Sequence, residues 1–209
     1  MGAEGRADRA EGARPQADRR REGEIVLSRD TGSLGADNAD NADTFNNAAI
    51  RPIPAERIAE AHELESLCYP ADQAATLEAF RYRQATFPGF FLGAWEGDRL
   101  VGLVCGVRTD ARDCADVGIK RSHGGRTDGR KLCILSVAAH PDRRGQGLAT
   151  RLLDGVVSAA KAAGLAAVML MSQRELVPWY EARGFRATGL VHAEHGGVRW
   201  HDMRLDFGA

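Results

Sequence analysis

The chain has 209 residues, which is enough for one well-buried domain with an appendage and too few for two full domains. Its 28 basic and 29 acidic side chains nearly cancel, so no long-range field draws the chain to nucleic acid or to an anionic membrane. We therefore expect one folded unit with no nucleic-acid partner and no membrane partner.

The cysteines and the apolar runs indicate the compartment. Cys68, Cys105, Cys114 and Cys133 form no C-x-x-C pair and no cluster with histidine at zinc-ligand spacing. This pattern favours a reducing compartment and predicts no metal site. No apolar run resembles a signal peptide or is long enough to cross a bilayer, so we expect a soluble, cytoplasmic protein.

Residues 1–46 differ in composition from the rest of the chain. They are dominated by Ala, Gly, Arg, Asp, Glu and Asn and offer few side chains that a core could bury. Such a segment cannot offset the entropy lost on ordering. We expect a disordered tail over 1–46 and a folded domain over 47–209.

The hydrophobic pattern of the first part of the domain changes from strand to helix and back. Proline ends the first apolar run at Pro52, and Tyr69-Pro70 ends the helical spacing that precedes it. A polar turn at 96–99 lies between two apolar runs, which is typical of an antiparallel hairpin. We expect a strand over 48–52, helices over 54–68 and 76–84, and paired strands over 90–95 and 100–105.

The rest of the chain alternates between buried strands and helices. The polar segment 109–130 is longer than an ordinary hairpin connection, which indicates a functional loop or a disordered segment. The continuous apolar run 132–137 is expected of a strand covered on both faces. We expect strands over 132–137, 165–171, 185–191 and 198–206, and helices over 147–163 and 178–184. The whole pattern predicts a mixed sheet flanked by helices.

The segment 137–149 carries the chemistry of phosphate binding. A diphosphate needs several backbone N–H groups at close range, and Gly145 and Gly147 let the backbone approach while the following helix presents its positive N-terminal end. Arg143 and Arg144 add cations whose geometry suits phosphate. No Lys-Ser/Thr follows the glycines and no acidic residue closes the next strand, which argues against a nucleotide-triphosphate or dinucleotide site.

The same segment resembles a known family. Arg144-x-x-Gly147-x-Ala149 is similar to the [Q/R]-x-x-G-x-[G/A] acyl-CoA signature of the GNAT superfamily. The resemblance implies an α/β (α+β) GNAT fold: a mixed, mostly antiparallel sheet of about seven strands, with strands four and five splayed, flanked by about four helices. It also implies acetyl-CoA as co-substrate. The contacts it implies are the backbone of Val137 and Ala139, for pantetheine and the oxyanion, and Arg143, Arg144, Gly145, Gln146, Gly147, Leu148 and Ala149.

A second resemblance, covering 50–207, is to the arylalkylamine N-acetyltransferase branch, and particularly to its microbial members. It is carried by 65–75, 132–137 and 176–185. It implies acetyl transfer to a small primary amine, with Tyr180 as the general acid that protonates the departing CoA thiolate.

The sequence departs from that branch at the base. Animal members carry two histidines at positions that align with Cys133 and Leu135, and neither is present. Glu65 is our first candidate to take the proton from the amine through water; His62 and a water chain to solvent are alternatives. His123 in the polar loop is either a substrate contact or solvated. Cys133 is either a covalent nucleophile or, as is more common for a thiol in an apolar strand, a packing residue.

Aromatic and apolar side chains are expected to shape the amine pocket. We expect Tyr69, Pro70 and Phe80 to contact the substrate, with Tyr82 and the long loop nearby, which suits an arylalkylamine. A polyamine pocket would use the nearby carboxylates Glu63, Glu65, Asp72 and Glu78. The alternatives left open are a GNAT enzyme for a polyamine, an amino-acid derivative or a protein N-terminus, and a catalytically silent acyl-CoA-binding domain.

Overall fold

A computed structural model describes residues 48–71, 73–114, 125–195 and 198–208, with only the backbone for 193–195. The expected disordered tail over 1–46 lies outside these residues, as do Asp72 and His123.

Seven strands form one sheet in the order β1-β2-β3-β4-β5-β7-β6. The described elements are β1 (Ala49–Pro52), η1 (Ala55–Arg57), α2 (Ile58–Cys68), α3 (Leu77–Thr86), η2 (Pro88–Phe90), β2 (Phe91–Glu96), β3 (Arg99–Thr109), β4 (Lys131–Ala139), η3 (Pro141–Arg143), α5 (Leu148–Ala162), β5 (Ala167–Gln173), η4 (Arg174–Leu176), α6 (Val177–Glu181), β6 (Arg186–His195) and β7 (Val198–Asp206). Neighbouring strands are antiparallel except for β4 and β5, which are parallel. The predicted fold class and element order are confirmed.

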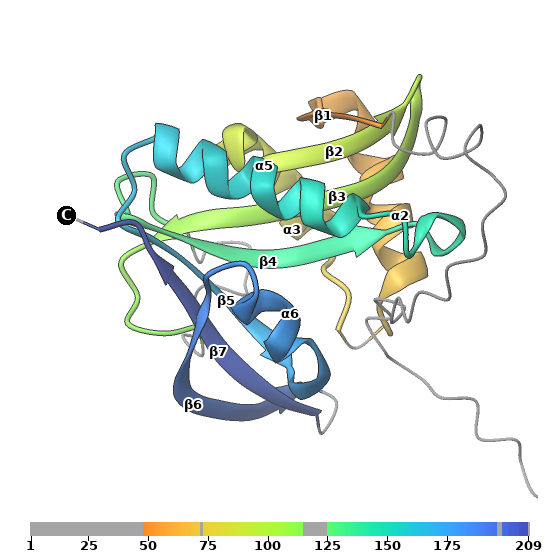
Figure 1. Cartoon of the computed structure of the whole chain (residues 1–209). Coiled ribbons are helices and arrows are strands. Elements are labelled where there is room, and N and C mark those ends of the chain that lie inside the picture. Colours follow the sequence, from red (N-terminus) through yellow and green to blue (C-terminus); the bar gives the residue numbers. More distant parts are fainter. Residues whose placement is uncertain (1–47, 72, 115–124, 196–197, 209) are drawn as a thin grey trace, which may run out of the picture.

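The pairing between β4 and β5 is short, so the two strands splay apart. Their register runs only from Lys131 opposite Ala167 to Cys133 opposite Met169, although β4 continues to Ala139 and β5 to Gln173. The predicted splay is therefore present. It leaves one edge of β4 without a neighbouring strand in the middle of the sheet (Figure 1).

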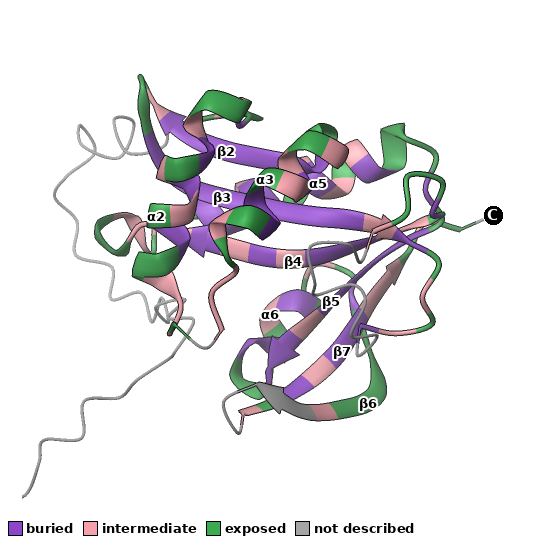
Figure 2. Cartoon of the chain, turned by 180° about the vertical axis from the view of Figure 1, so that it is seen from behind, coloured by how far each residue is buried: buried purple, intermediate pink, exposed green. Residues whose placement is uncertain are grey.

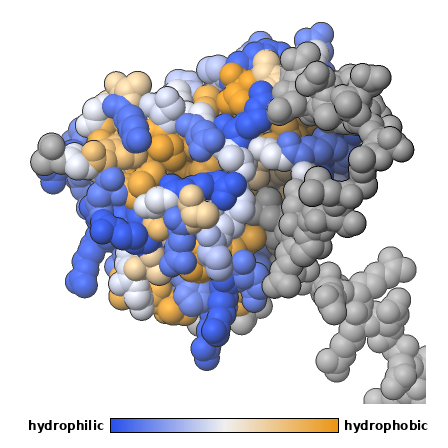
Figure 3. All heavy atoms as spheres, viewed as in Figure 1, coloured by the Kyte–Doolittle hydropathy of each residue, from blue (hydrophilic) through white to orange (hydrophobic). Residues whose placement is uncertain are grey.

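Helices cover both faces of the sheet. In Figure 1, α5 and α6 lie in front of the sheet and α2 and α3 lie behind it. The apolar stripe predicted for α5 packs on the sheet, with Leu148, Leu152, Val156 and Ala160 all buried. Seen from behind, the strands between the helix layers are buried, whereas the edge strand β6 is largely exposed (Figure 2). On the face that carries α5 and α6, hydrophilic side chains lie among hydrophobic ones (Figure 3).

Two expected strands begin later than the apolar pattern suggests, for the same reason. Gly164 (φ 68°) and Gly184 (φ 84°) adopt left-handed backbone after α5 and α6, as expected of helix stops. The residue after each glycine forms a hydrogen bond back to the preceding helix. Leu165 N–H donates to the Ala160 carbonyl at 3.1 Å. Phe185 N–H donates in the same way to the Tyr180 carbonyl at 3.2 Å. Both apolar residues cap a helix instead of opening a strand.

None of the described helices combines the length and the apolar character that a membrane span requires.

Candidate active site

The turn before α5 has the geometry that an anion-binding backbone requires. Gly145 (φ 73°) and Gly147 (φ 75°) are both left-handed, a conformation that side chains other than glycine's strongly disfavour. The first bond of α5 runs from Arg151 N–H to the Gly147 carbonyl at 3.1 Å, so the N–H groups before it have no helical acceptor. The first turn of α5 contains no acidic residue. The positive end of a long helix is therefore available to phosphate oxygens.

The two arginines of the turn differ in what they contact. The guanidinium of Arg143 forms a bidentate ion pair with Glu96 at the end of β2, with Nε–Oε1 at 2.8 Å and Nη2–Oε2 at 3.1 Å. This pair lowers the pKa of Glu96. Arg144 lies beside the Cys68 thiol, whose pKa is raised by burial and lowered in part by Arg144. Arg143 therefore anchors the turn to the sheet, and the phosphate contacts expected of Arg143 and Arg144 stay predictions.

Peptide groups of β4 face the splay. Because alternate residues of an antiparallel pair bond to the partner strand, and His140 N–H bonds to Val101 of β3, the peptide groups of Val137 and Ala139 point the other way, toward β5. The Tyr69 hydroxyl donates to the Val137 carbonyl at 2.8 Å and accepts from Val137 N–H at 3.2 Å. The Cys68 thiol donates to the Ala139 carbonyl at 3.3 Å. The end of α2 thus occupies an edge that an acyl-CoA chain could also use.

A cavity of about 290 Å³ opens at this edge. Its wall consists of Glu65, Tyr69 and residues 73–75, Arg83 of α3, Cys114, residues 133–137 of β4, Leu170 and Met171 of β5, Tyr180 of α6 and Trp200 of β7. The structure therefore brings together four residues that the sequence nominated for different roles: Glu65, Tyr69, Val137 and Tyr180.

Phe80 and Pro70 stand apart from the cavity wall. Phe80 is fully buried in the core beneath α2 and α3, edge-on to Phe91 with ring centroids 5.2 Å apart and edge-on to His62 at 5.8 Å. Phe80 therefore packs in the core and does not line the cavity, and its expected contact with the substrate stays a prediction. Pro70 is half-buried in the turn after α2. His62 is also outside the wall, with its Nε2 held 3.1 Å from the Ala75 carbonyl.

Glu65 is a buried carboxyl group on the cavity wall. It is 3% exposed, and its Oε2 accepts the N–H of Ala75 at 2.9 Å. Burial raises its pKa above the ordinary value, against the opposing effects of Ser136, the Ala75 N–H and Arg83. The hydroxyl oxygen of Ser136 is buried and forms no hydrogen bond of acceptable geometry with the part of the chain that the structure describes. A carboxylate with a raised pKa is a stronger base than an exposed one, so Glu65 can accept a proton here.

Tyr180 reaches the cavity from the opposite face of the sheet. It is buried, with its ring edge-on to Trp179 and Phe185 at centroid distances of 4.8 and 5.6 Å. Burial raises the pKa of its phenol, with Arg183 acting weakly in the other direction. Its neighbour Tyr69 also has a raised pKa, from burial first and then from Tyr180 and Glu65. Both phenols therefore stay protonated at neutral pH and can donate a proton.

The wall also contains residues to which the sequence assigned no role in the site, among them Arg83, Cys114 and Trp200. Of these three, only Arg83 carries a usable signal, because it shares the buried face of α3 with Ala79 and Phe80 at helical spacing. Cys114 lies 3.6 Å from Cys133, sulfur to sulfur, and both are buried. The Cys133 thiol therefore packs against a second thiol at the cavity wall.

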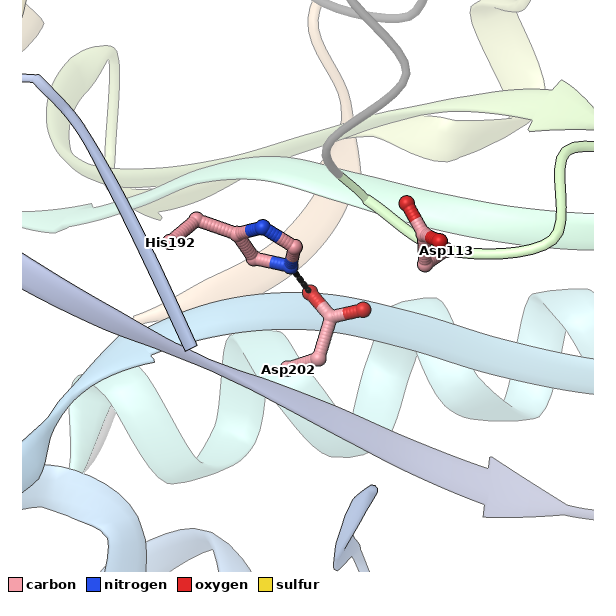
Figure 4. A group of neighbouring side chains, drawn as sticks. All are labelled: Asp113, His192 and Asp202. Carbon is pink, nitrogen blue, oxygen red and sulfur yellow. Dashed lines mark ion pairs between the residues drawn. The ribbon is translucent and has the colours of Figure 1, made fainter. Parts of the chain in front are cut away.

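One group of described side chains could supply three ligands to a metal ion: Asp113, His192 and Asp202 (Figure 4). Their ligand atoms lie within 4.8 Å of one another. His192 Nε2 is 3.4 Å from Asp202 Oδ1, and Asp202 Oδ2 accepts the Cys114 N–H at 3.3 Å. Burial raises the pKa of Asp202. The three come from distant segments, so sequence spacing could not reveal the group, and the expected absence of a metal site stays a prediction.

Comparison with solved structures places this geometry among acetyltransferase folds. The loading GNATL domain of CurA from Lyngbya majuscula superposes with a TM-score of 0.66 at 17% identity, over 77% of this chain and 98% of that one. Ard1 from Thermoplasma volcanium gives 0.60 at 15% identity, over 76% and 97%. The putative acetyltransferase yncA from Salmonella typhimurium, solved with its cofactor acetyl-CoA, gives 0.56 at 18% identity, over 78% and 95%. No curated protein matched the sequence.

The family assignment comes from the sequence itself. Residues 58–185, more than half of the chain, match the model of the acetyltransferase (GNAT) family. The matched stretch includes the turn before α5, the splayed β4 and β5, and Tyr180 of α6. The chain therefore belongs to the GNAT family of acetyltransferases.

Proposed function

We propose that the protein is an acetyl-CoA-dependent N-acetyltransferase that acts on a small primary amine of the arylalkylamine type. The observation that carries the proposal is the meeting of three features at the splay: the left-handed glycine turn at the start of α5, the open edge of β4, and a cavity with a buried carboxyl group and a buried phenol. Acetyl-CoA supplies an activated thioester at this place.

The turn and β4 would hold the two ends of the coenzyme. Backbone N–H groups from Gly145 to Ala149, with Arg144, bind the diphosphate. Arg143 keeps the turn in place through its ion pair with Glu96. The peptide groups of Val137 and Ala139 face the splay, where they bond to pantetheine and stabilise negative charge on the thioester oxygen. For Val137 N–H to do so, the Tyr69 hydroxyl that now bonds to it has to move aside.

Glu65 and Tyr180 would each carry one of the proton transfers. An alkylamine with a pKa near the lysine value of about 10 is mostly protonated at neutral pH and has to lose a proton before it can attack. Glu65, directly or through one water, accepts that proton. As the new C–N bond forms, the attacking nitrogen releases its second proton to water. The C–S bond then breaks, and Tyr180 donates its proton to the departing thiolate and regains one from solvent.

The lining of the cavity supports an amine with an aromatic or apolar body. Trp200, Leu135, Met171 and the rings of Tyr69 and Tyr180 face the cavity. Aromatic rings bind apolar groups over large areas and prefer edge-on or offset contacts with other rings. Such a wall fits an arylalkylamine better than a polyamine.

The test is product formation with acetyl-CoA and a panel of amines that includes tryptamine, phenethylamine, a polyamine, free amino acids and a peptide with a free N-terminus. We expect equal amounts of free CoA thiol and of an acetylated product from panel members that carry an aromatic group, detected by mass. If calorimetry shows no affinity for acetyl-CoA, the protein is not an acetyltransferase. Binding without turnover on any amine would identify a silent acyl-CoA-binding domain instead.

A further inference from the structure

Arg83 is a buried cation that forms no ion pair with any residue that the structure describes. Its side chain is 4% exposed and lies on the cavity wall. Among the described residues, its one hydrogen bond runs from Nη1 to the Cys105 sulfur at 3.8 Å, and its Nε is buried and has no partner there. Within the described residues no carboxylate lies within ion-pair distance of it. Cys105 cannot balance the charge, because burial raises the pKa of its thiol to about 11.

Such an arrangement is costly in a folded protein. Removing a guanidinium from water without a paired charge is unfavourable by several kcal/mol. Guanidinium presents five N–H donors in a rigid fork that fits a carboxylate with two parallel bonds. A buried arginine that faces a ligand cavity with most of these donors unused therefore has the properties of an anion-binding group.

Glu65 is close to Arg83 but does not fill that role. The guanidinium lowers the pKa of Glu65, yet burial outweighs this effect and the pKa remains raised. One carboxylate oxygen of Glu65 is engaged by the Ala75 N–H. The cavity therefore offers a fixed positive charge and, beside it, a carboxyl group that can gain or lose a proton.

The location of Arg83 assigns the anion to the amine and not to the coenzyme. Arg83 and Glu65 belong to α3 and α2, on the face of the sheet opposite α5 (Figure 1). The phosphate-binding turn opens on the α5 face. Arg83 and Glu65 therefore contribute to the cavity wall from the helices that lie opposite α5.

We infer that the amine which the protein acetylates carries a carboxylate beside its amino group, and that Arg83 holds this carboxylate while Glu65 faces the amino group. The substrate class is a free α-amino acid with an aromatic or apolar side chain. This inference rests on the proposed acetyl transfer and narrows its acceptor. In an α-amino acid a single carbon joins the two groups, and Arg83 and Glu65 line the same cavity.

The test compares amines that differ only by the carboxylate: tryptophan with tryptamine, and phenylalanine with phenethylamine. With wild-type protein we expect kcat/KM for each amino acid to exceed that of its amine by about 100-fold, because the amine leaves Arg83 unpaired. Arg83→Met should remove this preference, mainly through a higher KM for the amino acid. Because the guanidinium also lowers the pKa of Glu65, the variant is judged by the ratio of kcat/KM for the amino acid to that for the amine, from which a change in the base cancels. Arg83→Lys should restore part of the preference.

The control is Arg81→Met, which removes the same charge from an exposed position of the same helix. It should leave kcat/KM for both the amino acid and the amine unchanged. Equal or better turnover of the amines by wild-type protein overturns the inference and leaves the acetyl transfer standing; this comparison needs no variant to fold. Turnover of tryptamine with succinyl-CoA that depends on Arg83 would overturn the assignment of the carboxylate to the amine. Failure of every amine contradicts the proposed function itself.

Discussion

The coenzyme end and the acceptor end of the candidate site are built in different ways. The coenzyme end is mostly backbone: two left-handed glycines and the first N–H groups of α5 lie within a few residues of one another. The acceptor end consists of side chains from α2, α3, β4, β5, α6 and β7. The proposed coenzyme contacts therefore come mostly from the backbone, whereas the acceptor contacts depend on the identity of each side chain.

Because the two ends are built differently, substitutions at the two ends should have different effects. A change in the turn before α5 should alter affinity for acetyl-CoA and leave the choice of amine unchanged. A change in the cavity should alter turnover or the choice of amine and leave coenzyme affinity unchanged. The proposed division between the two ends is wrong if either kind of substitution alters both the affinity for acetyl-CoA and the choice of amine.

Tyr180→Phe should give the largest effect. Loss of the phenol proton should lower kcat by about 100-fold or more, because the thiolate would then have to depart unprotonated or take a proton from water. The dissociation constant of acetyl-CoA, measured by calorimetry, should not change. Tyr82→Phe, on the half-buried side of α3, is the matched control and should retain wild-type turnover. Undiminished turnover in Tyr180→Phe would remove this residue from the mechanism.

Glu65→Gln should lower kcat/KM by roughly 10- to 100-fold and change its pH dependence. Glu65 acts as a base only when ionised, so activity rises as pH rises through its pKa. Because burial raises that pKa, the acid limb of the wild-type profile should lie above the ordinary carboxyl range. In Glu65→Gln the only remaining pH dependence should be the rise in activity as the amine substrate itself loses its proton. An identical acid limb in both proteins would assign the base to another group or to water.

The raised pKa of Glu65 also has a consequence for stability. Its folded-state pKa lies above its unfolded value, so ionisation opposes folding, and wild-type stability falls as pH rises through the folded-state pKa. Glu65→Gln should lose that dependence. Denaturant unfolding of both proteins across acidic to neutral pH measures it, independently of catalysis.

Gly147→Ala tests the coenzyme end. An alanine at φ 75° costs about 1–2 kcal/mol, and relaxing this strain would move the N–H groups away from the phosphates. We expect the dissociation constant of acetyl-CoA to rise about 10-fold, which corresponds to about 1.4 kcal/mol, with the amine preference unchanged. Gly164→Ala carries similar strain at the other end of α5, where φ is 68° and the added methyl group also meets open space. It should lose similar stability but bind acetyl-CoA normally.

The same contrast explains what the sequence could predict. The α5 stripe, the helix stops at Gly164 and Gly184 and the turn at 143–149 depend on neighbours in sequence, so periodicity and glycine positions are informative. Arg83 and Phe80 show the limit. Both lie on the buried face of α3, and only the packing of α3 against β2 and β3 determines that Phe80 is enclosed while Arg83 reaches a cavity.

Arg143 shows a second limit at the coenzyme end. The sequence predicts a phosphate contact for it, but its partner Glu96 lies at the end of β2, 47 residues away, and the ion pair becomes visible only once β2 is placed beside the turn. Residue type and spacing predict that a cation is present, whereas the fold determines which anion it meets.

The smallest effect is expected from removing divalent metal ions. Asp113, His192 and Asp202 form the one group of described side chains suited to a metal, and none of the three lines the cavity. Asp202 instead bonds to the backbone of Cys114 and pairs with His192 across β6 and β7, which indicates a role in holding these segments together. We expect dialysis against EDTA, and the variant His192→Gln, to leave kcat/KM within experimental error of wild type. If EDTA caused a large loss of turnover and added Zn²⁺ or Mn²⁺ restored it, a metal ion would be required for catalysis. The coenzyme and acceptor ends would then not be sufficient for activity.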